Sequence, residues 1–145
     1  MKKLAALLAL PIFASMPSAQ EAVKPDSYLC IPDMATGFKF ANGKWQQANF
    51  TVANRKYLLR HAKESDASWV KEREWAWTEF GETVAWAGCD KPDFDYMKCG
   101  GVMQEIQINV RTLRYQAYWL GTYLAGSEDQ MSDTPSIEIG KCSPL

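Results

Sequence analysis

The strongest constraint in this sequence is a hydrophobic alternation of period two. Ile106, Ile108 and Val110 alternate with Gln107 and Asn109. Successive side chains of a strand point to opposite faces of a sheet, so this period predicts β-strands. The same spacing recurs in 38–40 and 113–119, and further strands are predicted at 57–61, 75–80, 83–89 and 137–139, the last ending at Gly140.

The dipeptide Asn42-Gly43 predicts a tight hairpin after the first alternating segment. Both central residues of a type I′ turn need positive φ, which asparagine and glycine tolerate. A two-residue loop places Phe40 opposite Trp45 on one face. Phe50 lies on the other parity from Trp45, which indicates either a bulge between them or a strand partly covered on both faces.

About eight short strands with turn signals between them predict an all-β fold, either an antiparallel sandwich or a small closed barrel. The segment 62–74 is ambiguous. Ser65 or Asp66 could cap a short helix that carries Trp69 and Arg73, or the segment is an irregular connection. The polar stretch 126–135 is predicted to be a loop.

The first residues have the pattern of a secretory signal peptide. Lys2 and Lys3 precede an apolar run from Leu4 to Ala14, and small residues follow as far as Ala19. We expect removal of 1–19, which leaves one exported domain, 20–145, in the periplasm or outside the cell. No other apolar stretch is long enough for a membrane helix.

The charge balance excludes two classes of partner. The chain has a formal charge of −1, and loss of two lysines with the signal would make it −3. Nucleic-acid binding and polybasic membrane binding both need a concentrated positive field. Neither function is therefore expected.

The expected exported domain contains four cysteines. An oxidising compartment favours two disulfides, for which three pairings exist. Cys89 and Cys99 flank a short predicted turn, and Cys30 and Cys142 lie near the two ends of the domain. We therefore predict Cys89–Cys99 and Cys30–Cys142. No two cysteines have the close spacing of a zinc knuckle.

No catalytic constellation is recognisable, so an enzyme and a cofactor are not expected. The single histidine, His61, ends a basic strand with no nucleophile pattern near it. Asp90, Asp93 and Asp95 could offer oxygen ligands to calcium, but they lack the spacing of a known calcium loop, so a solvated acidic loop is the prediction.

The tryptophans are the most unusual feature. Trp75 and Trp77 share one face of a predicted strand, and Trp86 belongs to the next. The three indoles either line an apolar ligand cavity or fill the core of a small domain. Acidic loops at 90–95 and 128–133 offer a second kind of site, for a basic protein partner.

Several segments resemble a group of small exported proteins of Gram-negative bacteria that has no assigned activity. They are Tyr28-Leu29-Cys30, Ala35-Thr36-Gly37-Phe38, Trp45, Thr112-Leu113-Arg114-Tyr115, Thr134-Pro135 and Ile137-Glu138-Ile139-Gly140-Lys141-Cys142. The resemblance implies export and disulfides but assigns no catalytic residue. In architecture alone, the chain is also similar to periplasmic lysozyme inhibitors, which are small disulfide-bonded β-barrels.

The sequence therefore predicts an exported, non-enzymatic binding protein, with an inhibitor of another protein among the options, that acts through loops at one end of a β-structure. The alternative is a carrier of a small apolar ligand in a cavity lined by Trp75, Trp77 and Trp86.

Overall fold

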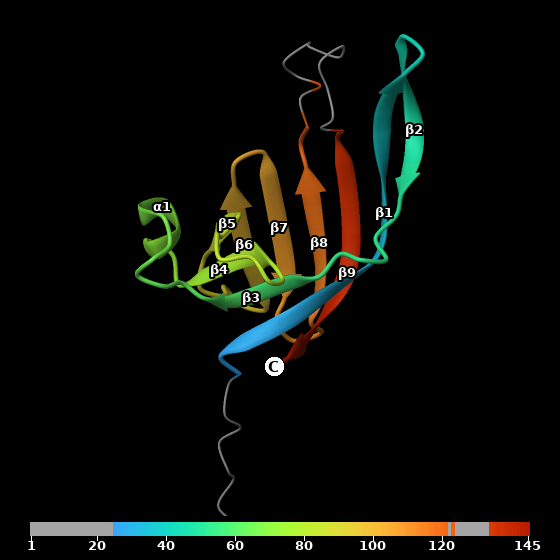
Figure 1. Cartoon of the computed structure of the whole chain (residues 1–145). Helices are drawn as coiled ribbons and strands as arrows, with labels where there is room; N and C mark the ends of the chain where they lie inside the picture. The colour runs from blue at the N-terminus through green and yellow to red at the C-terminus, as the bar shows by residue number, and fades with distance from the viewer. Residues whose placement is uncertain (1–24, 122, 124–133) are drawn as a thin grey trace, which may run out of the picture.

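A computed structural model describes residues 25–121, 123 and 134–145, and it is an antiparallel β-barrel (Figure 1). Eight strands close the barrel and one further strand, β2, pairs on its outside. The predicted signal segment 1–19 lies outside the described residues. The elements are β1 (Ser27–Ala41), β2 (Lys44–Phe50), β3 (Tyr57–His61), α1 (Ser68–Lys71), β4 (Trp75–Glu79), β5 (Ala87–Cys89), β6 (Tyr96–Gly101), β7 (Gln104–Asn109), β8 (Arg114–Trp119) and β9 (Ser136–Pro144).

Barrel closure depends on the long first strand. One edge of β1 pairs with β9, and the other pairs first with β3 and then with β2. The register of β1 on β9 shifts between Pro32 and Met34. This bulge moves the inward positions from even to odd residues, so Cys30 and Ala35 both face the interior. The bulge lets one strand serve both the barrel and the hairpin.

The predicted hairpin at Asn42-Gly43 is confirmed. Both residues have positive φ, 55° and 73°, and Phe40 lies opposite Trp45 with ring centroids 5.6 Å apart. The hairpin of β1 and β2 projects beyond the barrel (Figure 1). The register between β1 and β2 contains no bulge, so Phe50 lies on the opposite face from Trp45. Both faces of β2 are partly covered.

One half of the barrel interior is filled by a packed core. Both predicted disulfides are present, Cys30–Cys142 and Cys89–Cys99, and each joins directly opposite residues on neighbouring strands. Nine further buried residues complete this core: Tyr57, Leu59, Trp75, Trp77, Ala87, Met97, Ile106, Ile108 and Tyr115. The interior of an eight-stranded barrel is just wide enough to be filled by side chains or to hold one small ligand.

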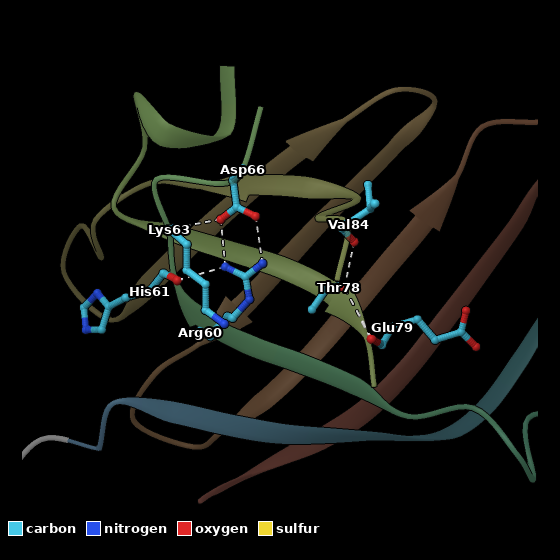
Figure 2. A network of polar contacts seen from close by, with 7 residues as sticks. All are labelled: Arg60, His61, Lys63, Asp66, Thr78, Glu79 and Val84. Carbon is cyan, nitrogen blue, oxygen red and sulfur yellow. Dashed lines mark hydrogen bonds and ion pairs between the residues drawn. The ribbon is translucent and has the colours of Figure 1, made fainter. Parts of the chain in front are cut away.

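The ambiguous segment 62–74 covers the outer face of β4 and β5. Its short helix α1 buries Val70 against Ala76 and Ala85. The predicted cap was wrong, because the helix begins after Ala67 with no side-chain cap. Asp66 instead accepts both guanidinium contacts of Arg60 at 2.8 Å (Figure 2). The segment is therefore anchored by a buried ion pair.

Two predicted strand boundaries were wrong. The strand expected at 83–89 shortens to β5, because Thr78 donates its hydroxyl to the Val84 carbonyl and holds 80–86 as a connection. The last strand does not end at Gly140, since its pairing with β1 continues to Pro144. Within the described part of the chain, no helix is long and apolar enough to cross a membrane.

Candidate functional site

A cavity of about 360 Å³ opens at one end of the barrel, next to the packed core, and we call it the barrel-mouth cavity. Its walls come from β2, β3, β4, β7, β8 and β9 and from the connections that contain Arg55, Trp86 and Thr134. The lining residues are Phe50, Arg55, Tyr57, Trp77, Glu79, Trp86, Gln104, Ala117, Tyr118, Trp119, Thr134, Ser136 and Glu138.

Strand alternation places the aromatic wall. Tyr57 on β3 and Trp77 on β4 are inward residues, and their rings stack with centroids 4.8 Å apart. Trp86 precedes β5, and its N–H donates to the Trp77 carbonyl at 2.8 Å. Gln104 donates its side-chain amide to the Trp86 carbonyl at 2.8 Å. The backbone around Trp86 is therefore held although it lies outside a regular strand.

Glu138 is a buried carboxylate at the inner end of the cavity. Its Oε1 accepts the Tyr115 hydroxyl at 2.9 Å, and its Oε2 accepts the Tyr57 hydroxyl at 3.3 Å and Arg55 Nη1 at 3.2 Å. Only 5% of the residue is exposed. A buried carboxylate is tolerated only when it is paired and hydrogen-bonded, and these three donors meet that need.

The Glu138 carboxylate also affects the pKa values of the two tyrosines. Burial raises the pKa of Tyr57 and of Tyr115, and the negative charge of Glu138 raises both further. Both hydroxyls therefore stay protonated and act as donors to Glu138.

Two further charged side chains line the cavity, the carboxylate of Glu79 and the guanidinium of Arg55. Glu79, the last residue of β4, is an inward residue on the same strand face as Trp77. The Arg55 side chain is 47% exposed at the entrance, while its Nη1 contacts Glu138. The lining thus combines aromatic rings with a small set of charged groups.

The structure separates the three predicted tryptophans. Trp77 and Trp86 line the barrel-mouth cavity, with Trp77 itself almost fully buried. Trp75 lies in the packed half, where its ring stacks on His61 with centroids 3.9 Å apart. Both indoles on β4 belong to the core, and a spacing of two residues along the strand decides that Trp77 also borders the cavity whereas Trp75 does not. Trp119, which lines the cavity, was not among the predicted site residues.

The acidic loop carries no candidate metal site. Asp90 pairs with Arg73 at 2.9 Å, and Asp95 lies 3.8 Å from Arg111. In the part of the chain that the structure describes, no group of three or more potential ligands could hold a metal ion. The second predicted acidic loop, 128–133, lies outside the described residues.

Sequence reasoning missed Glu138, Tyr57 and Tyr115 as site residues. The pattern Ile137-Glu138-Ile139 by itself favours inward isoleucines, yet Ile139 is 42% exposed. Cys142 contains the signal that could have corrected this. The Cys30–Cys142 disulfide is buried on the inner face of β1 and β9, so position 142 is inward, and the period of two then makes 138 inward as well.

No protein-family model, no curated protein and no solved structure matches this chain, so the site rests on its own geometry.

Proposed function

We propose that the protein is a binding protein that holds a small organic molecule in the barrel-mouth cavity. The observation that carries the proposal is the cavity itself, about 360 Å³ with Trp77, Trp86 and Trp119 in its lining. Ligand sites are concave, of some 300–1,000 Å³, and combine aromatic walls with a few placed polar groups. Arg55, Glu79 and Glu138 supply those groups here.

The two disulfides are consistent with an oxidising, exported environment for this activity. Signal removal and residence in the periplasm or outside the cell belong to the same proposal. We therefore expect the ligand to be a molecule of the cell envelope or of the medium outside the cell.

Tryptophan emission and thermal unfolding of the disulfide-bonded protein test the proposal against a fragment library. We expect some fragments to change the emission and to raise Tm. Trp86→Ala should weaken their binding about tenfold, because it removes one wall of the cavity. Trp69→Ala is the matched control, since Trp69 lies on α1 and outside the cavity lining. A library with no binder, or equal losses in both variants, would contradict the proposal.

A protein partner is the second candidate, and the projecting hairpin favours it. Phe38 is 54% exposed there, and the outer edge of β2 pairs with no strand among the described residues. Such an edge can accept a partner's strand. In a hairpin closed at Ala41 and Lys44, the N–H of Gln47 points away from β1. Gln47→Pro should therefore abolish capture of a partner from periplasmic extract while leaving the barrel folded.

A further inference from the structure

The charged groups of the barrel-mouth cavity are not balanced. Its lining contains two carboxylates, Glu79 and Glu138, but one guanidinium, that of Arg55. An excess negative charge beside low-dielectric aromatic walls favours a positive ligand over a negative one.

The two carboxylates differ in what they already bind. Glu138 accepts three hydrogen bonds, from two tyrosine hydroxyls and from Arg55. These contacts hold it as part of the structure. The ion pair with Arg55 also compensates its charge.

Glu79 differs from Glu138 in this respect. Within the described residues, its carboxylate makes no hydrogen bond and no ion pair, while its backbone carbonyl accepts the Thr78 hydroxyl and the Glu82 N–H. Its side chain extends away from the Arg60–Asp66 network (Figure 2). Half-buried at the end of β4, it is the free charge of the cavity.

Aromatic rings lie next to this free charge. Glu79 is the register partner of Tyr57, and Trp77 lies two residues before it on the same strand face. Tyr57 in turn packs against Trp86 with ring centroids 6.3 Å apart. Aromatic faces attract cations through their quadrupole, and the attraction grows where water is excluded.

Resting on the proposed function, we propose that the ligand is an organic cation, an amine or quaternary ammonium with an apolar body. Glu79 is its counter-ion, and the rings of Tyr57 and Trp86 flank its apolar part, with Trp77 stacked against Tyr57. An anionic ligand would meet the uncompensated carboxylate of Glu79, and a neutral one would leave that carboxylate without a counter-charge.

Three probes of nearly equal shape separate charge from size. They are 2-phenylethylamine, 2-phenylethanol and 3-phenylpropanoate, measured at pH 7 by calorimetry. We expect the amine to bind about tenfold more tightly than the alcohol, and the carboxylate to bind most weakly. The preference for the amine should shrink at high salt.

A matched pair of variants tests whether Glu79 is the counter-ion of the bound amine. Glu79→Gln should lower the affinity for the amine to that for the alcohol and leave the alcohol unaffected. Glu82→Gln is the control, because Glu82 is exposed and three residues further along the chain. It should leave all three affinities unchanged.

The outcomes keep the two proposals apart. Equal affinity for amine and alcohol, or an unchanged amine affinity in Glu79→Gln, overturns the cation proposal and leaves the ligand cavity standing. If none of the three probes binds while library fragments do bind and lose affinity in Trp86→Ala, the cation proposal is likewise overturned and the ligand cavity stands. Failure of the probes and of the whole library overturns both.

Discussion

At the scale of single residues, Glu138 has the largest consequence for the molecule. Its three donors come from different places in the chain: Arg55 from the β2–β3 connection, Tyr57 from β3 and Tyr115 from β8. The carboxylate itself is on β9. One polar residue on β9 therefore links the neighbouring strand β8 to β3, which lies beyond β1. An apolar residue of the same size could not make these hydrogen bonds.

This arrangement predicts an alkaline limit to stability. The pKa values of Tyr57 and Tyr115 are raised by burial and by Glu138, whereas both phenols of the unfolded chain ionise near pH 10. Stability is therefore lost as pH rises above about 10. Each tyrosine should lower the free energy of unfolding by about 1.4 kcal/mol per pH unit in that range. Urea unfolding between pH 9 and 11.5 measures the slope.

Replacing each tyrosine by phenylalanine tests whether the two hydroxyls cause the loss of stability above pH 10. Tyr57→Phe and Tyr115→Phe should each remove one tyrosine's share, although each also loses a hydrogen bond at neutral pH. A slope in both variants that equals that of the parent protein would show that the alkaline loss arises elsewhere.

The candidate site shows how far single residues are predictable from sequence. Trp77 and Trp86 were predicted from their spacing, and both line the cavity. Trp75 shares the spacing and, like Trp77, lies in the core, but it does not reach the cavity. The alternation indicates which face of a strand a side chain occupies, not its position along the barrel axis. Glu138 was missed because a carboxylate is the residue least expected inside a barrel.

At the scale of elements, a buried ion pair holds the segment 62–74 to β3, in addition to the packing of Val70 and the more exposed pair of Arg73 with Asp90. Arg60 and Asp66 form two contacts of 2.8 Å, and their side chains are 8% and 1% exposed. The Lys63 N–H also donates to Asp66 at 2.7 Å. No sequence pattern links Arg60 to Asp66 specifically, so the sequence offers Asp66 only as one of two possible helix caps.

Asp66→Asn should destabilise the protein strongly. It leaves the buried guanidinium of Arg60 without a counter-charge, which typically costs about 3–5 kcal/mol. Glu64→Gln is the matched control, because the Glu64 side chain is fully exposed where it pairs with Lys71. That change should leave Tm unaltered. Thermal unfolding of both variants at pH 7 gives the comparison, and similar Tm values would contradict it.

Acid titration provides a second readout for the same pair. Hydrogen bonding from Arg60 lowers the pKa of Asp66 below its usual value near 3.8. The contribution of Asp66 is therefore present above about pH 4 and is lost as pH falls through the lower folded pKa. The difference in stability between the parent protein and Asp66→Asn should shrink as pH falls from 5 to 2.

At the scale of the whole molecule, the class of fold was predictable and its closure was not. Period-two patterning and the four cysteines predicted an all-β domain with joined ends, and both disulfides are confirmed. A sandwich and a barrel share these features. Closure depends on the bulge between Pro32 and Met34, which lets β1 pair with β9, β3 and β2, and a bulge leaves no period in the sequence to detect.

The two disulfides should contribute unequally, although both are buried and both join neighbouring strands. Cys30–Cys142 spans 112 residues and Cys89–Cys99 spans 10. The loop-entropy relation then gives about 4.8 and about 2.7 kcal/mol. Replacing Cys30 and Cys142 by alanine should therefore destabilise the protein by about 2 kcal/mol more than replacing Cys89 and Cys99. Urea unfolding of the two double variants measures this difference. Both double variants remove two buried cysteines, so the local losses of packing are similar. Equal stabilities would contradict the loop-entropy prediction and would mean that the unfolded chain already keeps its two ends together without the Cys30–Cys142 bond.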